Sequence, residues 1–444
     1  MEPAPKVEKD FSAQVDSQLP VAESLASAGK LVEALESLAT LEKQTRNSAD
    51  TASNTRILIA NVTMCFNAKE WKFLGERVVL LSKKHGLLKG AVSKMIQEAM
   101  SLLDKTPNVA TKLELIETLR TVTDGKIFVE VERARLTMIL SKIRETEGKI
   151  VEAADILQEL QVETFGSMDK REKTEFILEQ MRLTLAKKDY PRVLIISRKI
   201  SLKFFEDVAQ HDLKLRFYEL MIQYSIHENL FLNTCKHYRH IYDTPAVKND
   251  QKLWSAALQN VVFFVILSPF DNEQSDLIHR IYEDANLSKL GLLKDLVKCF
   301  VTNELVRWPK IEEIYGPTLK ATSVFDKSEG GQARLKALHE RVIEHNIRVI
   351  AKYYTRISIK RLTQLLDLSV QDSEEFLSKL VVSKTIHAKM DRPAGIINFV
   401  PRKTPNTVLN DWSSNINQLL SLISKTTHLI AKEEMVASIT QSKN

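Results

Sequence analysis

Three residues near the C-terminal third could hold a metal ion by type: His339, Glu340 and His345. A zinc-peptidase helix carries its two histidines four residues apart, so that both imidazoles project from one face and the glutamate between them can activate water. Here the histidines are six residues apart, which places them on different faces of a helix. The spacing therefore favours an ordinary helix with one partly buried histidine over a zinc site.

Residues of other catalytic types also lack the neighbours that their chemistry needs. The pair Gly330 and Gly331 has no following Lys-Ser/Thr and no preceding strand, so it is not a phosphate-binding loop. The three cysteines, Cys65, Cys235 and Cys299, lie far apart without metal spacing, which is typical of buried thiols in a reducing compartment. The sequence predicts no catalytic residue, no cofactor and no metal, and therefore no enzyme.

The composition is that of an ordinary soluble protein with a helical bias. The 444 residues are 44% apolar and 27% charged, and glycine and proline number only 12 each. Basic residues exceed acidic ones by six, which indicates a mixed solvated surface rather than a nucleic-acid footprint. Residues 1–10 are charged and are predicted to be disordered, with no signal peptide. The most apolar run, VVFFVIL at 261–267, is too short to span a membrane.

Residues 11–320 read as one helical arm. Their apolar residues recur with helical period, and short connectors carry Gly, Asn, Asp or Pro, as in antiparallel helix pairs. The stripe formed by Trp254, Leu258, Val261 and Val265 predicts a buried helix, with a strand as the alternative because the run is β-branched. The loop at 321–333 ends the arm. The expected helices are 21–28, 31–45, 51–67, 71–84, 89–104, 109–121, 127–145, 150–162, 170–187, 191–206, 211–226, 230–241, 252–267, 273–284 and 290–305.

A weak internal repeat runs through this arm. GKLVEALESL (29–38) is similar to GKIVEAADIL (148–157), and in both a helix opens after a glycine. Five helix starts fall 40 residues apart in two runs, Leu31 with Trp71, and Ile150 with Tyr190 and Leu230. A period near 40 in helical pairs is the signature of a TPR-like α-solenoid, although the register is lost between about 90 and 126. A non-repetitive helical domain is the alternative.

Residues 338–402 carry a different pattern, with three helices and a small sheet. One helical stripe is formed by Ile343, Ile347, Ile350 and Tyr354, and a second by Leu338, Val342, Val349 and Tyr353. This helix is therefore expected to be covered on two sides. A compact leucine-rich helix follows. Ser369 and Asp372 then form a capping pair for the next helix. Alternating residues on either side of DRPAG at 391–395 predict a hairpin. Three helices with a wing of strands define a winged-helix domain.

The winged helix could serve nucleic acid or protein. The helix that would enter a major groove carries Asp372, Glu374 and Glu375 in its N-terminal half, where phosphates would repel carboxylates. Protein–protein use is therefore favoured, through main-chain hydrogen bonds at an open edge of the short sheet. The residues expected at this sheet interface are Ile357, Ile359, Ile386, Met390, Ile397 and Phe399.

A last helix is expected at 407–437. Its apolar residues step by three and four in strict alternation, which is a heptad seam. No other part of the chain accounts for this seam, so it is expected to bind helices from outside. Its residues are Leu409, Trp412, Ile416, Leu419, Ile423 and Ile430, with Thr426 between the last two.

A helical-repeat arm running into a winged helix and a trailing helix resembles the PCI module of the proteasome lid, the COP9 signalosome and the initiation factor 3 complex. Several long stretches are similar to a PCI subunit of the proteasome lid in particular, and the resemblance begins near residue 20. Those stretches are GKIFVEVERARLT (125–137), LQELQVETFGSM (157–168), FILEQMRL (176–183), TNELVRWP (302–309) and RVIEHNIRVIAKYYTRI (341–357).

This resemblance implies a non-catalytic scaffold that helps to organise the regulatory particle for degradation of ubiquitinated proteins. The winged helix would join neighbouring PCI subunits of the lid, and the last helix would enter a bundle of lid C-termini. The arm would reach toward the ATPase ring and core particle and contact the deubiquitinase subunit. Such a hetero-oligomer would work in the cytoplasm and the nucleus, and neither nucleic acid nor a membrane would be a partner. The alternatives are a PCI scaffold of the COP9 signalosome or initiation factor 3, or a nucleic-acid-binding winged-helix protein.

Overall fold

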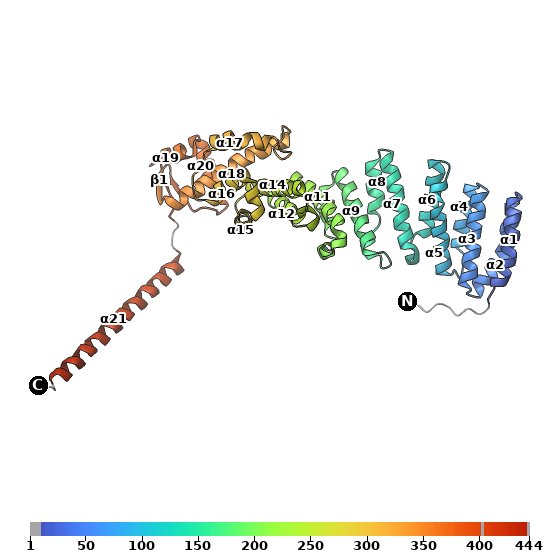
Figure 1. Cartoon of the computed structure of the whole chain (residues 1–444), viewed down its shortest axis with the longest axis horizontal. Helices are drawn as coiled ribbons and strands as arrows, with labels where there is room; N and C mark the ends of the chain where they lie inside the picture. Colours follow the sequence, from blue (N-terminus) through green and yellow to red (C-terminus); the bar gives the residue numbers. More distant parts are fainter. Residues whose placement is uncertain (1–9, 401–403, 442–444) are drawn as a thin grey trace. The chain divides into compact units, whose positions relative to one another are not determined.

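The computed structural model of the chain describes residues 10–400 and 404–441, and these are helical apart from one small sheet (Figure 1). The expected disorder at 1–10 and the end of the winged helix at 401–402 fall on residues outside this description, except for Asp10. The described residues form two units. Unit 1 runs to Asn229 and includes His240–Asp250, and unit 2 comprises Leu230–Arg239 and everything from Gln251 onward. The expected arm at 11–320 thus contributes to both units.

The helices of unit 1 follow one another in pairs, and several also pack against the helix two places along the chain, as α3 does on α5 and α4 on α6. This arrangement is an α-solenoid. Its elements are α1 (Ser12–Ser27), α2 (Leu31–Asn47), α3 (Thr51–Asn67), α4 (Trp71–Ser82), α5 (Lys89–Ser101), η1 (Leu103–Lys105), α6 (Val109–Thr123), η2 (Ile127–Val129), α7 (Glu130–Thr146), α8 (Ile150–Gln158), η3 (Val162–Thr164), α9 (Lys170–Ala186), α10 (Tyr190–Ser197), η4 (Leu202–Glu206), η5 (Val208–Gln210), α11 (His211–His227) and α13 (Pro245–Lys248).

The 40-residue period has a local cause, which is a repeated turn between paired helices. Gly29 and Gly148 have φ of +86° and +80°, in the left-handed region that glycine enters without steric cost. Lys69 and Lys188 adopt the same conformation at the matching places, with φ of +60° and +65°. In each turn the next residue's amide donates to the carbonyl five residues before it, which closes a Schellman motif. Each motif ends one helix, and the next helix begins two residues after the left-handed residue.

Ion pairs between successive repeats carry the register through the stretch where the sequence repeat is weak. The two partners of each pair lie between 37 and 42 residues apart, which is one repeat. Gln97 of α5 also donates to Glu132 of α7 at 2.7 Å. The solenoid therefore continues where sequence similarity fades. The pairs are Asp16–Arg56, Glu42–Lys84, Arg120–Glu159, Arg135–Glu172, Glu145–Arg182, Arg171–Asp212 and Glu179–Arg216.

Helix bounds in unit 1 differ from the expectation in several places, most clearly at α1 and α10. α1 begins at Ser12 rather than at residue 21, and Pro20 lies inside it. Val15 and Ala22 of this helix are buried, and their packing compensates for the hydrogen bond that Pro20 cannot donate. The helix expected at 191–206 is two pieces, α10 and η4, because the chain turns after Ser197 to bury Phe205 against Phe217.

Unit 2 contains the winged helix and the helices before it. α12 begins in unit 2 and ends in unit 1. The elements are α12 (Phe231–Tyr242), α14 (Gln251–Leu267), α15 (Asn272–Tyr282), η6 (Ala285–Lys289), α16 (Gly291–Val301), α17 (Trp308–Lys320), α18 (Glu329–Tyr353), β1 (Arg356–Ser358), α19 (Ile359–Leu366), α20 (Val370–Val382), β2 (Lys389–Asp391), β3 (Ile396–Asn398) and α21 (Pro405–Gln441). No helix of the described residues is long and apolar enough to cross a bilayer.

Two segments of unit 2 test local expectations. The apolar run at 261–267 is the end of helix α14, and all seven of its residues are buried, so the strand alternative is wrong. The loop expected at 321–333 ends earlier, because α18 begins at Glu329 with Ser328 as its N-cap. Gly330 and Gly331 therefore lie in a helix. A Cβ at Gly331 would stand 2.2 Å from the Asp326 carbonyl oxygen, so close approach of backbone explains this glycine.

The winged-helix core confirms the two-sided burial of α18 except at its end, where Tyr353 and Tyr354 are exposed. Ile343, Ile347 and Ile350 pack with Leu362, Leu377 and Phe399 in one cluster, whereas Leu338, Val342 and Val349 are buried elsewhere in unit 2. Ser369 caps α20, since its Oγ accepts the Asp372 amide at 3.1 Å and donates to the Asp372 carboxylate at 2.7 Å. Both predictions came from apolar spacing and cap chemistry, which are local signals.

The sheet is shorter than expected and its order corrects one assumption. Its three antiparallel strands run β1-β3-β2, so β3, with Ile397 paired to both Ile357 and Met390, is the centre. The expectation that Ile397 lies at an open edge is therefore wrong. Ile359 begins α19 rather than continuing a strand, because Ser358 caps that helix, and Ile386 precedes β2.

Candidate interaction surfaces

The residues that could have formed a metal or catalytic site are held apart. His345 is buried on α18, with Nε2 3.2 Å from the Glu304 carbonyl oxygen and its ring edge-on to Phe300. Burial, with the nearby Arg348, lowers the pKa of His345 to about 4. His339 instead packs against Trp308, with ring centres 4.6 Å apart. No three His, Cys, Asp or Glu side chains of the described residues cluster as a metal site requires.

The cysteines are placed as thiols of the core. Cys65 and Cys235 are buried and Cys299 is half-buried, and all three are free. Burial raises the pKa of Cys65 to about 11 and that of Cys235 to about 12. A thiol with so high a pKa stays protonated near neutral pH and is a poor nucleophile.

The open edges of the sheet belong to β1 and β2. Bonds from the Phe399 amide to Thr355 and from the Ile359 amide to Gly395 show that odd-numbered residues of β1 face β3. By the alternation of an antiparallel ladder, the main chain of Arg356 and Ser358 faces outward from β1, and that of Met390 faces outward from β2. Any main-chain pairing with another subunit would use these residues.

The side chains expected at the sheet interface are placed mainly in the core of the winged helix. Ile357, Ile397 and Phe399 are buried, and Ile359, Ile386 and Met390 are half-buried around the same cluster. Their side chains hold the sheet against α18 and α20. The sequence pattern identified the residues that build the sheet, but apolar alternation marks the buried face rather than the edge.

The three carboxylates of α20 are partly neutralised within the winged helix. Glu374 pairs with Arg392 of the wing, Glu375 pairs with Lys379 at 2.7 Å, and Asp372 belongs to the N-cap. All three lie in the first half of α20, the helix that a groove-binding winged helix would present to phosphates.

The helix α21 presents its apolar residues to solvent. None of its side chains from 405 to 439 is buried, and the six seam residues expected from the sequence have exposed fractions between 40% and 63%. A third heptad position adds the exposed Leu422, Leu429 and Val436. The spacing of three and four that defines the seam covers only two positions per heptad and does not include them. Three apolar positions per heptad make a face wider than a two-stranded coiled coil needs.

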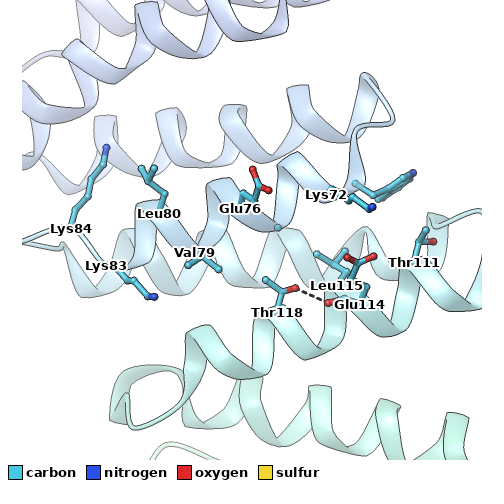
Figure 2. A pocket seen from close by; sticks show the side chains of 12 residues that line it. Lys72, Glu76, Val79, Leu80, Lys83, Lys84, Thr111, Glu114, Leu115 and Thr118 are labelled. Carbon is cyan, nitrogen blue, oxygen red and sulfur yellow. Dashed lines mark hydrogen bonds between the residues drawn. The ribbon is translucent and has the colours of Figure 1, made fainter.

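Unit 1 carries a groove of about 650 Å³ between α4 and α6 (Figure 2). Lys72, Glu76 and Glu114 line it together with the apolar Val79 and Leu115, and Figure 2 shows the Thr118 hydroxyl bonded to the Glu114 carbonyl oxygen at 2.6 Å. Charges of both signs therefore line this groove.

Paired helical repeats, a winged helix and an apolar terminal helix together define the PCI class of subunit. Three family models match the chain in that order. They are described as PSMD12/CSN4, N-terminal (residues 33–250), PCI domain (298–400) and 26S proteasome regulatory subunit RPN5 C-terminal domain (406–438).

Curated relatives are similar over nearly the whole chain. The 26S proteasome regulatory subunit rpn501 of Schizosaccharomyces pombe is 48% identical over 92% of both chains. The 26S proteasome regulatory subunit RPN5 of Saccharomyces cerevisiae is 44% identical over 97% of both. The 26S proteasome non-ATPase regulatory subunit 12 of Dictyostelium discoideum is 45% identical over 98% of this chain and 96% of its own. The chain belongs to this family, the RPN5 or non-ATPase subunit 12 family of proteasome regulatory subunits.

Proposed function

We propose that the chain is a non-catalytic scaffold subunit of the 26S proteasome lid, which helps to organise the regulatory particle for degradation of ubiquitinated proteins. The observation that carries the proposal is the wide apolar face of α21 on a chain similar to proteasome regulatory subunits over almost its full length. A helix with this face is stable in water only when other helices cover it. A hetero-oligomeric complex supplies those helices.

The shape of the apolar face favours a bundle over a single partner helix. Leu419 and Ile423 lie on the seam, and Leu422 and Leu429 lie one position to its side, so that the apolar stripe covers more than a third of the circumference. A two-stranded coiled coil would leave this second row in water. The C-terminal helices of other lid subunits are the proposed partners.

The winged helix is the second proposed contact, with neighbouring PCI subunits of the lid. The outward main chain of Arg356 on β1 or of Met390 on β2 would extend the sheet by one strand. The repeats of unit 1 are proposed to contact the deubiquitinase subunit of the lid, the ATPase ring and the core particle. These contacts would form in the cytoplasm and the nucleus.

The seam proposal is tested by placing charges on α21. The double variant Leu419→Asp, Ile423→Asp should leave the remainder of the chain folded and block its entry into the lid, because each carboxylate desolvated in a bundle costs several kcal/mol. The matched control Ser421→Asp, Ser424→Asp adds the same charge on the opposite face and should assemble. The measurement is native gel electrophoresis of tagged lid in cells. Normal assembly of the seam variant would contradict the proposal.

The sheet-edge proposal is tested at Met390. Met390→Pro removes an outward amide from an edge strand and should weaken co-purification of a neighbouring PCI subunit, whereas Met390→Ala keeps the amide and should not. Ile397→Pro is a poor test, since β3 is central and loss of its ladder bond would disrupt the sheet itself. Equal recovery of PCI neighbours with both Met390 variants would show that the β2 edge is not used.

A further inference from the structure

A pocket of about 400 Å³ lies within unit 2, between α15, α16, α18 and the segment that leads into β2. Five of its lining residues are cationic or can become so, and no lining residue is Asp or Glu. The five come from three separate parts of the chain. They are His279, His345, Arg348, Lys352 and His387.

Arg348 is the central cation of this pocket and lacks an acidic partner. Its guanidinium carbon lies 3.7 Å from the centre of the Phe270 ring. Its Nε is buried without a hydrogen-bond partner among the described residues, and no carboxylate oxygen there lies within 4 Å of it. The nearest acid on its own helix, Glu344, instead pairs with Arg341 at 2.8 Å. Burial lowers the pKa of Arg348 to about 10, because the nearby Glu344 carboxylate only partly offsets the loss of solvent.

The other four residues differ in burial and in charge. His345 is buried at the base, and its low pKa keeps it neutral near pH 7. Lys352 is exposed at the mouth, where Nζ donates to Asn303 Oδ1 at 2.7 Å, and His279 and His387 are also exposed. A ligand that enters would meet fixed positive charge at Arg348 and Lys352, with two imidazoles as further hydrogen-bonding groups.

We propose that this pocket binds a phosphate monoester. The planar guanidinium offers paired donors that match two oxygens of a phosphate, and Lys352 supplies a second charge for the dianion. A monocarboxylate would be satisfied by Arg348 alone and would leave Lys352 without a role. The volume falls within the range of small-ligand sites, and no acidic lining residue would repel the ligand.

The test is thermal unfolding of the full-length chain in inorganic phosphate, compared with chloride of equal ionic strength. The wild type should show a saturable rise of a few degrees in Tm, by the linkage of ligand binding to stability. Arg348→Met should abolish the rise. Arg348→Lys, which keeps the charge but loses the fork, should weaken binding at least tenfold. Arg361→Met, a matched substitution of an exposed arginine on α19, should keep the full response.

Three results would overturn the proposal. They are no rise beyond chloride in the wild type, an equal rise with acetate, and a response that Arg348→Met retains. Arg348→Met should leave Tm nearly unchanged without phosphate, because methionine keeps an apolar contact with Phe270 while a half-buried cation without an ion pair is removed. A fall of several degrees there, together with an unchanged phosphate response in Arg348→Lys, would mark Arg348 as a packing residue and also overturn it.

The source of the phosphate is distinguished by two further probes. Calorimetric titration with glycerol 2-phosphate measures binding of a free small ester, and titration with a phosphoserine peptide measures binding of a modified protein segment. A peptide that binds tenfold more tightly than the small ester would assign the site to a phosphorylated partner. Equal affinities would assign it to a free metabolite. The scaffold role proposed above does not depend on either result.

Discussion

His345 illustrates how a single buried residue links the fold to pH. It lies on α18 with only 4% of its surface exposed, and its hydrogen bond to the Glu304 carbonyl does not offset the loss of solvent. Its pKa in the folded chain, about 4, is well below the ordinary value of 6.5. The unfolded chain therefore takes up this proton first as the pH falls, and stability decreases between about pH 6.5 and pH 4.

We expect His345→Gln to remove part of this acid sensitivity. At pH 5, protonation of His345 in the unfolded chain lowers the free energy of unfolding of the wild type by roughly 2 kcal/mol. This corresponds to about 1.4 kcal/mol for each pH unit below 6.5. Urea unfolding at pH 7.5 and pH 5.0 measures the loss in both chains. Burial also lowers the pKa of His240 and His339, so part of the loss remains in the variant. An identical pH dependence in the two chains would contradict the assignment to His345.

At the residue scale the sequence predicted the separation of two histidines but not the pocket. The six-residue spacing predicts different helix faces, and the structure places His339 and His345 in different surroundings. The pocket around Arg348 had no signal in the sequence, because its lining residues come from segments more than 100 residues apart. Only the tertiary fold brings Phe270, Arg348 and His387 together, and a half-buried arginine without an ion pair cannot be recognised before its surroundings are known.

The turns that close each helical pair are the recurring element of unit 1. The sequence showed them where glycine occupies the left-handed position, at Gly29 and Gly148. Lys69 and Lys188 adopt the same conformation, so the repeat there was visible only in the spacing of helix starts. A residue with a Cβ in this region is less stable than glycine by about 1 kcal/mol.

Lys69→Gly should accordingly stabilise the chain by about 1 kcal/mol, because glycine relieves the left-handed conformation at a solvent-exposed turn. Its neighbour provides the control. Ala68 has φ of −75°, so Ala68→Gly relieves nothing and should cost about 0.5–1 kcal/mol in backbone entropy. Chemical denaturation of the two variants checks the opposite signs. If both substitutions destabilise the chain, the turn at 69 does not carry the strain assigned to it.

Helices were predictable from the sequence and the small sheet only in part. Helix spacing placed the starts of α2, α4, α8 and α10 within one residue, since periodicity and turn chemistry are local. Three-residue strands are too short to show a reliable alternation, and the start of α19 at Ile359 depends on a cap rather than on a pattern. Strand order, and with it the identity of the edge, is a tertiary property that no local signal contains.

The whole molecule combines a solenoid with a buried apolar core and a terminal helix, α21, whose apolar residues are exposed. In unit 1, ion pairs one repeat apart join successive repeats, and a continuous core runs from Val15 to Leu140. α21 differs, since its apolar residues stay exposed from Val408 to Ile439. The sequence predicted this contrast, because a heptad seam without a matching seam elsewhere indicates external partners.

Deletion of residues 404–444 should therefore leave the thermal stability of the isolated chain unchanged to within about 1 °C. A helix that buries none of its side chains contributes little to the cooperative unfolding of the remainder, since burial of apolar surface is the main source of stability. The same deletion should abolish entry into the lid, which separates a role in assembly from a role in folding. Differential scanning calorimetry of both chains at equal concentration measures the first effect. A fall of about 5 °C or more, equivalent to a loss on the order of 2 kcal/mol for a domain of roughly 200 residues such as unit 2, would mean that α21 folds back onto its own chain and is not free for partners.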